Sequence, residues 1–300
     1  MDFAALPSGI TNFISKHYRK DVLKHVLSQD LKDKMKSNLH THSSFCDGKN
    51  TPEEVVIAAI CKGFSTIGFS GHGYTDFDIR YCIKDVEGYQ AEIRRLKEKY
   101  KGEIEVYLGV EEDAFCYVNR GDYDYIIGSS HYYKVNGEYY PIDSNPERFK
   151  ICLELFDYDT ERMAEDYYGK FCDYINKRKP DVVGHFDLIT KFDEMGESLF
   201  LKNANYNKIV EKHIETVADS GCVFEVNTGA ISRGYRKTPY PAENLLHVLK
   251  KQDARLTVSS DSHSIETLDF GFDEAKHLLR DVGFRKIYHL HGGGFVAEEI

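Results

Sequence analysis

The chain has 300 residues, of which 41% are hydrophobic and 29% are charged, the balance of an ordinary globular protein. No apolar run approaches the roughly 20 residues that a membrane helix needs, and the first 20 residues lack the pattern of a secretory signal. The chain has a net charge of −10, so it lacks the excess of basic residues that non-specific nucleic-acid binders use. We therefore expect neither a membrane nor a nucleic acid as a partner, and we exclude a disordered or collagen-like chain.

The cysteines and the histidines differ in what they indicate about the protein. The seven cysteines are scattered, odd in number and form no C-x-x-C pair, which argues against a disulfide framework and fits a reducing cytoplasm. The thirteen histidines are more informative, because histidine is the commonest metal ligand in proteins. Their positions relative to the predicted strands therefore decide how the sequence is interpreted.

Residues 1–35 differ from the rest of the chain. Apolar residues recur near helical spacing in the charged stretch 12–36, which predicts a helical N-terminal extension without a motif. The main body is predicted to be one domain over residues 36–300, since no Pro/Gly/Ser-rich linker divides it.

In the main body, short apolar runs alternate with helix-like stretches. The runs are mostly β-branched or aromatic, as in buried parallel strands. Strands are predicted at 37–40, 66–70, 104–110, 123–127, 181–184, 223–226 and 256–258, with a possible eighth at 286–288. Helices are predicted at 51–63, 85–101, 160–179, 204–220, 241–252 and 272–282. Alternation of this kind indicates an α/β fold, and seven or eight repeats predict a closed or nearly closed barrel.

One long segment departs from this alternation. Residues 132–160 contain Asn136-Gly137, a dipeptide typical of a tight β-hairpin turn. A connection of this length inside a compact domain is usually functional, so we predict an active-site loop with a small hairpin.

Imidazoles and carboxylates follow nearly every predicted strand. In a (β/α) barrel the carboxyl ends of the strands meet at one rim, where the chemistry takes place. The side chains expected there are His40, His42, Asp47, His72, Glu111, His131, His185, Glu225, Asp261 and His263.

This set has the chemistry of a metal site. In His40-x-His42 and Asp261-x-His263 the two side chains of each pair point the same way, because side chains alternate along an extended segment. Nitrogen and oxygen donors without cysteine suit Zn, Mn or Fe, and about nine candidate ligands require two or three ions. A single buried histidine more often only fills a core, but packing alone does not place six of them at successive strand ends.

At this point the sequence resembles a known family, the PHP (polymerase and histidinol phosphatase) superfamily. The resemblance spans about residues 36–290. It is carried by His40-Thr41-His42, Asp47-Gly48, Ser70-Gly71-His72-Gly73, Glu111, His131, His185 and Asp261-Ser262-His263. Three further strings resemble the monofunctional histidinol-phosphate phosphatases: Gly128-Ser129-Ser130-His131-Tyr132, Gly184 to Phe192, and Glu225-Val226-Asn227-Thr228-Gly229.

The resemblance implies a distorted (β/α)7 TIM-like barrel of PHP type with a trinuclear metal centre. One ion would be held by His40, His42, Glu111 and Asp261, a second by Glu111, His131 and His185, and a third by Asp47, His72 and His263. It also implies basic residues that bind phosphate, for which Lys191, Arg233 and Arg236 are the candidates. Each could instead be a surface charge near a loop. Glu112 and Asp113 are acidic enough to attract the cationic end of histidinol.

The resulting hypothesis is hydrolysis of L-histidinol phosphate to L-histidinol and phosphate in histidine biosynthesis. A metal-bound hydroxide would attack phosphorus, and Asp261 or His263 would protonate the leaving alkoxide through water. Two alternatives remain open: a PHP phosphoesterase acting on another small phosphate ester or a nucleotide, and a metal-dependent binding module without catalysis.

Overall fold

The structure is a computed structural model, and it describes residues 35–196 and 198–300. The predicted helical extension over residues 1–35 lies outside the described residues except for Met35. Among the described residues, no helix combines the length and the apolar character needed to cross a bilayer. All seven cysteines are free thiols.

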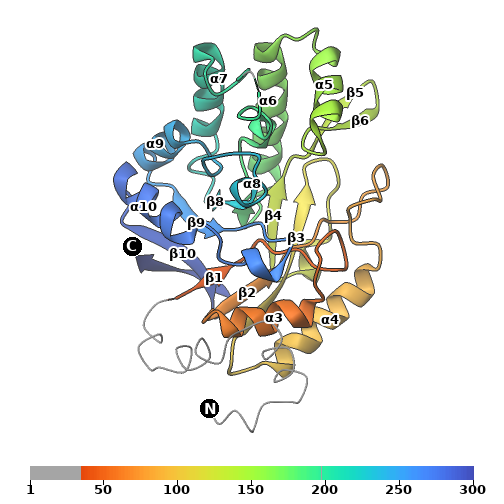
Figure 1. Cartoon of the computed structure of the whole chain (residues 1–300), viewed down its shortest axis with the longest axis vertical. Helices are drawn as coiled ribbons and strands as arrows, with labels where there is room; N and C mark the ends of the chain where they lie inside the picture. Colours follow the sequence, from red (N-terminus) through yellow and green to blue (C-terminus); the bar gives the residue numbers. More distant parts are fainter. Residues whose placement is uncertain (1–34, 197) are drawn as a thin grey trace.

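Seven parallel strands form the centre of the molecule, in the spatial order β1-β2-β3-β4-β7-β8-β9 (Figure 1). They are β1 (Ser37–Asn38), β2 (Thr66–Phe69), β3 (Glu105–Asp113), β4 (Tyr125–Ser129), β7 (Val182–Val183), β8 (Val223–Asn227) and β9 (Arg255–Ser259). Nearly every strand residue is buried, as expected for strands covered on both faces. This arrangement confirms the predicted (β/α)7 TIM-like barrel.

In the part of the chain that the structure describes, the first and last barrel strands are joined by main-chain hydrogen bonds just beyond their carboxyl ends. Thr41 and Ser262, just beyond β1 and β9, form an isolated parallel bridge. The His42 amide donates to the Ser262 carbonyl at 2.8 Å, and the Ser262 amide donates to the His40 carbonyl at 3.1 Å. The closing hydrogen bonds therefore lie among the predicted metal ligands.

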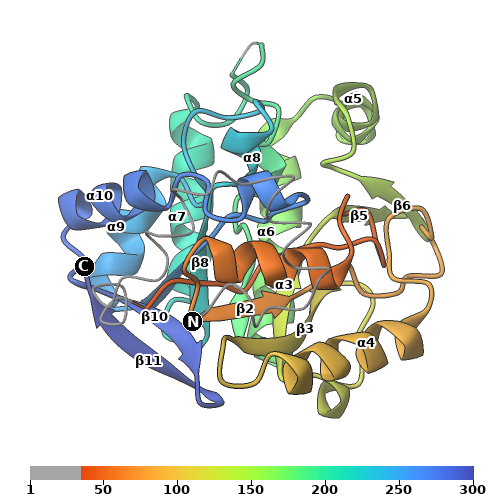
Figure 2. The same ribbon diagram turned by 60° about the horizontal axis from the view of Figure 1, so that its bottom comes forward.

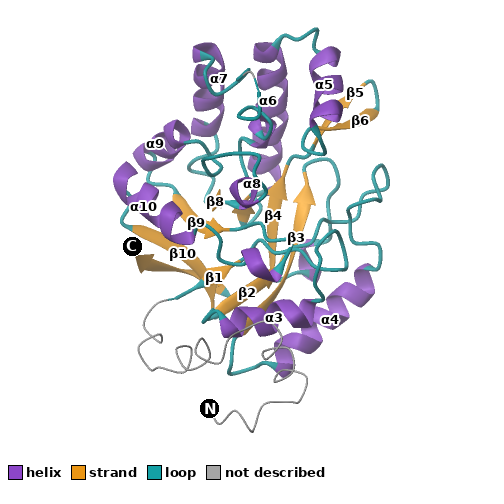
Figure 3. Cartoon of the chain, viewed as in Figure 1, coloured by secondary structure: helices purple, strands orange, loops and turns teal. Residues whose placement is uncertain are grey.

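Helices lie around the barrel strands and beyond their carboxyl ends (Figure 3). They are α3 (Pro52–Cys61), α4 (Val86–Lys99), α5 (Pro146–Leu155), α6 (Thr160–Arg178), α7 (Ala204–Glu215), α8 (Gly229–Ser232), α9 (Glu243–Lys251) and α10 (Phe272–Val282). Local sequence explains the start of α3, where Thr51 and Glu54 form a capping box and Pro52 occupies the first turn. Gly283 ends α10 with a φ of 106°, which glycine adopts at low cost.

The possible eighth strand is not part of the barrel sheet. Strand β10 (Lys286–His291) instead pairs in antiparallel fashion with β11 (Gly294–Glu299) as a separate hairpin. Figure 2 shows this hairpin at the end of the molecule that turns forward from the view of Figure 1. Leu290 and Phe295 of the hairpin pack with Leu39, Tyr107 and Tyr125, so the hairpin seals the barrel interior at the end away from the strand carboxyl ends.

The long segment 132–160 contains more structure than the sequence predicted. The expected hairpin is present as β5 (Tyr132–Val135) and β6 (Glu138–Pro141), with positive φ angles at Asn136 and Gly137. Helix α5 follows, although no helix was predicted there. The signal was available, since Asn145 caps the helix through the Arg148 amide and Pro146 occupies its first position.

Candidate metal centre

Glu111 lies at the centre of the predicted site. It extends from the carboxyl half of β3, is 1% exposed, and directs its two oxygens to different sets of imidazoles. Its Oε2 atom lies 2.8 Å from His72 Nδ1, 3.4 Å from His40 Nε2 and 3.7 Å from His42 Nε2. Its Oε1 atom lies 3.1 Å from the Nε2 atoms of both His131 and His185. One carboxylate therefore faces five imidazoles that come from four segments of the chain.

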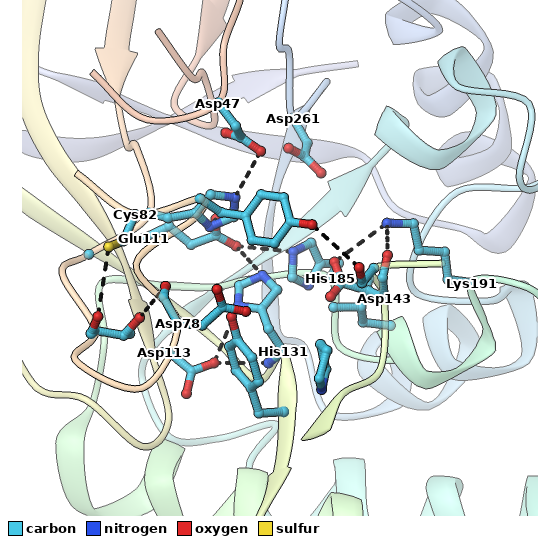
Figure 4. A pocket seen from close by; sticks show the side chains of 18 of the residues that line it. Asp47, Asp78, Cys82, Glu111, Asp113, His131, Asp143, His185, Lys191 and Asp261 are labelled. Atoms are coloured by element: carbon cyan, nitrogen blue, oxygen red, sulfur yellow. Dashed lines mark hydrogen bonds and ion pairs between the residues drawn. The ribbon is translucent and has the colours of Figure 1, made fainter. Parts of the chain in front are cut away.

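Two aspartates complete the cluster on the side of the barrel closure. Asp261 Oδ1 lies 3.2 Å from His42 Nε2 and 3.7 Å from His40 Nε2. Asp47 Oδ2 lies 3.3 Å from His263 Nε2 and 3.7 Å from His72 Nε2. Figure 4 shows Asp47 and Asp261 on one side of Glu111, and His131 on the other.

The structure brings all nine predicted ligands into four overlapping groups. In each group the nitrogen and oxygen atoms lie within 4.8 Å of one another. The groups are His42, Asp47, His72 and His263; His40, His42 and Asp261; His40, Glu111 and His185; and His72, Glu111 and His131. Because groups share members, several ions could be held side by side with bridging ligands.

Unpaired polar atoms provide a test of whether these residues suit a metal. Within the described part of the chain, five buried cluster atoms have no partner in hydrogen-bond geometry, although imidazole nitrogens lie as close as 2.8 Å to Glu111. They are His40 Nε2, His42 Nε2, His185 Nδ1 and both carboxylate oxygens of Glu111. A buried polar group without a partner costs about 1–3 kcal/mol, so such groups normally have a ligand, a water or an ion. Four of the five atoms face the centre of the cluster, and the residues therefore fit a metal centre.

The charges of the cluster agree with this interpretation. Burial alone would lower the pKa of His40 and His131, but carboxylates outweigh it and raise both pKa values to about 10. The principal carboxylates are Glu225 for His40 and Glu111 for His131. Burial would raise the pKa of Glu111, yet the facing imidazoles hold it well below its usual range. The carboxylates thus stabilise positive charge here, whether protons or metal cations carry it.

The backbone at Asp261 is adapted to its position. Asp261 has a φ of 46°, in the left-handed region that costs a non-glycine residue about 1–2 kcal/mol. Aspartate tolerates this region better than most residues. An unfavourable conformation retained at the end of a strand is typical of a functional position.

A pocket of about 230 Å³ opens onto the cluster. Its lining includes the ligand candidates Asp47, His72, Glu111, His131, His185, Asp261 and His263. The rest of its wall includes Asp78, Asp113, Tyr132 and Asp143. Phe77 packs edge-on against Tyr132 and stacks on Tyr139 at a centroid distance of 3.8 Å, so the loop after β2 meets the β5–β6 hairpin beside this wall.

The three phosphate-binding candidates fall in different places. Lys191 and Arg233 line the pocket. Arg233 donates from Nη2 to Asp261 Oδ2 at 2.9 Å and from Nη1 to the Asp261 carbonyl at 2.9 Å. Arg236 is not among the described residues that line the pocket: its side chain is fully buried and donates to Asp187 and Thr190.

The two acidic residues after Glu111 also separate. Glu112 is fully buried and accepts hydrogen bonds from Arg178, Tyr174 and the Val118 amide, so it does not reach the pocket as the sequence had suggested. Asp113 does line the pocket and accepts from the His131 amide at 2.9 Å. Successive residues of a strand face opposite sides, which explains the difference between Glu112 and its two neighbours.

Sequence reasoning assigned no role to Asp78, Tyr132 and Asp143, which line the pocket. Asp143 and Tyr132 lie in the segment 132–160, which was predicted to be an active-site loop, and Tyr132 also ends the string Gly128 to Tyr132 that resembles the histidinol-phosphate phosphatases. Asp78 gave no signal, since the stretch after His72 shows neither helical nor strand periodicity.

Comparisons with known proteins agree with this geometry. The family model of the PHP domain matches residues 38–229. A Schizosaccharomyces pombe protein named "Probable histidinol-phosphatase" is 29% identical over 277 residues, which cover 85% of this chain and 89% of that protein. The histidinol-phosphatase of Bacillus subtilis is 24% identical over 259 residues, covering 78% of this chain and 96% of that one.

A solved structure shares the fold. The histidinol phosphate phosphatase of Lactococcus lactis, crystallised with zinc, L-histidinol and phosphate, superposes with a TM-score of 0.65 at 20% identity. The match covers 87% of this chain and 98% of that one. Since the family model covers well over half of the chain, and includes most of the strands that carry the cluster, this protein belongs to the PHP domain family.

Proposed function

We propose that this protein is a metal-dependent phosphomonoesterase that hydrolyses L-histidinol phosphate to L-histidinol and phosphate, a step of histidine biosynthesis. The observation that carries the proposal is the cluster around Glu111, whose two oxygens face five imidazoles at the base of a pocket. The named relatives match along most of their own length, which supports the same activity for the whole chain.

The donor atoms favour two or three ions of Zn, Mn or Fe. Every member of the four groups offers an imidazole nitrogen or a carboxylate oxygen, and none offers a thiolate. The ligands would be His40, His42, Asp47, His72, Glu111, His131, His185, Asp261 and His263. When bound, such ions polarise a phosphoryl oxygen and lower the pKa of water, so that hydroxide is available near neutral pH.

The protein's own residues bind and orient the phosphate ester. Arg233 is held by two hydrogen bonds to Asp261, which fix its guanidinium at the edge of the cluster. Lys191 brings a second positive charge into the pocket. Together they would attract the phosphate and stabilise charge on its equatorial oxygens during the reaction.

The leaving alkoxide needs a proton, and the alcohol that it forms has to fit the charge of the pocket wall. Asp261 and His263 both line the pocket, and we assign to them delivery of this proton through water. Burial would raise the pKa of Asp261, but Arg233 and His40 hold it well below its usual range, so Asp261 would orient the water and His263 would carry the proton.

The wall next to the cluster carries three carboxylates, Asp78, Asp113 and Asp143, of which Asp78 is paired with Arg80 and Asp143 with Lys191. Three carboxylates facing two cations leave an excess of negative charge, which favours an alcohol with positive charge. The ammonium and imidazole groups of histidinol match that requirement.

The test is phosphate release from a panel of esters by protein of measured metal content. Histidinol phosphate should be hydrolysed far faster than sugar phosphates or nucleotides, and a chelator should abolish the activity until metal is restored. Faster hydrolysis of another ester would contradict the substrate and support a related phosphoesterase. Bound metal without hydrolysis of any ester would contradict catalysis and support a binding module.

A further inference from the structure

Glu225 is a buried carboxylate that the metal cluster does not include. It lies in the middle of β8, its side chain has no exposed surface, and it belongs to none of the four groups of ligand atoms. It nevertheless touches two of the residues that do belong to them. Its Oε2 atom lies 2.9 Å from His40 Nδ1, and its Oε1 atom accepts from the His185 amide at 2.6 Å.

Four donors saturate this carboxylate, two at each oxygen. Besides His40, Oε2 accepts from the Ser259 hydroxyl at 2.6 Å, and besides His185, Oε1 accepts from Asn227 Nδ2 at 2.8 Å. The Asn227 amide cannot turn round, because its Oδ1 accepts from the Gly229 amide at 2.8 Å. A carboxylate offers about four lone-pair sites, so Glu225 has no capacity left for an ion.

The contact with Glu225 determines which nitrogen of His40 carries a proton. Since Glu225 only accepts there, Nδ1 of His40 must be the donor. The other nitrogen, Nε2, faces Glu111 Oε2 and Asp261 Oδ1 and has no hydrogen-bond partner among the described residues. A histidine binds a metal through an unprotonated nitrogen, and a partner on the opposite nitrogen fixes that tautomer and the ring orientation.

We propose that Glu225 is a positioning residue for the metal centre: it holds His40 in the tautomer whose Nε2 binds metal, and it anchors the chain at His185. The carboxylate links β8 to residues at the ends of β1, β7 and β9, so a single side chain aligns ligand-bearing segments that are far apart in the sequence. The inference rests on the metal site of the proposed function.

The variant Glu225→Gln tests this idea with almost no change in shape. The new NH₂ group cannot face the His185 amide or Asn227, because both are donors whose orientation is fixed. The Ser259 hydroxyl can rotate to accept, and the His40 ring can move its proton. The NH₂ group therefore donates a hydrogen bond to His40 Nδ1, so the ring proton of His40 has to move to Nε2, the atom that should bind metal.

The first measurement is Zn²⁺ affinity by competition with a chromophoric chelator, together with the zinc content after dialysis. Glu225→Gln should weaken binding of the ion held by His40 by about 10- to 100-fold, the usual effect of removing such a partner. The matched control is Glu112→Gln, which also neutralises a buried strand carboxylate, but one bonded to Arg178 and Tyr174 and to no histidine. Unchanged Zn²⁺ affinity in Glu225→Gln would overturn the proposal, as would an equal loss in the control.

The second measurement needs no variant that could fail to fold. In the zinc-loaded protein with ¹⁵N-labelled histidine, long-range ¹H–¹⁵N spectra should show the His40 proton on Nδ1. A proton on Nε2, with zinc on Nδ1, would overturn the proposal. A protein that binds zinc as expected but releases no phosphate from histidinol phosphate would contradict only the proposed function.

Discussion

Lys191 and Asp143 form a pair inside the pocket. The Lys191 ammonium donates to the Asp143 carbonyl at 2.6 Å and lies 3.4 Å from its Oδ2 atom. It also lies 5.0 Å from the centre of the Tyr235 ring, within the range of a cation–π contact. The side chain is 11% exposed, so a normally flexible lysine is held in one position before any substrate arrives. Less entropy is then lost when its charge engages a phosphate.

Lys191→Ala should therefore weaken substrate binding without removing metal. A hydrogen bond to a charged group is worth about 1.5–3 kcal/mol, which predicts a rise in KM of roughly 10- to 100-fold. Steady-state kinetics with parallel metal analysis would measure both effects. Lys134→Ala is the matched control, because Lys134 is exposed, donates to the Tyr139 hydroxyl at 2.7 Å and is not among the described residues that line the pocket, so KM should stay unchanged. An unchanged KM for Lys191→Ala would remove this residue from phosphate binding.

Arg233 and Arg236 should respond differently to the same substitution. Arg233→Ala should raise KM more than it lowers metal content, since its guanidinium faces the pocket. Arg236→Ala should leave Asp187 buried without its cation and cost about 3–5 kcal/mol of stability. Thermal unfolding and kinetics on both variants separate the two roles. If Arg233→Ala lost metal with KM unchanged, Arg233 would be structural and would act only through Asp261.

His42→Ala and Asp261→Ala should each abolish activity and lower the metal content. His42 Nε2 and Asp261 Oδ1 lie 3.2 Å apart and share a group of ligand atoms, so either change removes a donor from the same place. Elemental analysis after dialysis, with activity on the same sample, makes the comparison. His247→Ala is the control, because its side chain is 52% exposed on α9 and should change neither quantity. Full metal content in both cluster variants would contradict the assigned ligands.

We expect His289 to make the stability of the protein depend on pH. Its Nε2 donates to the Glu298 carboxylate, so Nδ1 of the neutral ring accepts from the Ser37 hydroxyl. Burial lowers the pKa of His289 from 6.5, although Glu298 opposes this effect. The unfolded chain therefore binds a proton here at a higher pH than the folded protein does. The contribution of His289 is present above pH 6.5 and is lost as the pH falls below that value.

Urea unfolding of the metal-free protein between pH 7.5 and 5 would measure this loss. His289→Gln should show a shallower decrease over the same range, because glutamine does not titrate. Working without metal removes the separate pH dependence of metal binding. An identical slope in the wild-type protein and the variant would exclude His289 as the titrating group.

Much of the fold could be predicted because its strands and helices depend on short stretches of sequence. A buried apolar run such as Val223 to Val226 favours a strand, and the capping residues Thr51 and Pro52 favour a helix start. Each of these signals involves only a few neighbouring residues. The eighth strand could not be placed, because Lys286 to Tyr288 has strand character whichever partner it pairs with. Only tertiary contacts direct it to β11 and away from the barrel sheet.

The candidate site shows the same division between local and long-range information. Strand ends converge in any barrel, so the meeting of His40, Glu111 and Asp261 followed from topology alone. The difference between Arg233 and Arg236 could not be predicted, because it depends on Asp187 and Thr190 lying close to Arg236. The contact of Glu225 with His40 joins residues 185 positions apart and has no local signature.

The place where the barrel closes has a consequence for how long the protein persists in the cell. The first and last strands meet through hydrogen bonds at His40, His42 and Ser262, beside the cluster itself. A cation bound by both His42 and Asp261 would hold the first and last strands of the barrel together. Metal supply would then determine the protein's resistance to proteolysis as well as its catalytic rate. Under scarcity, copies lacking metal should be the first that cellular proteases remove, which returns their amino acids to the cell.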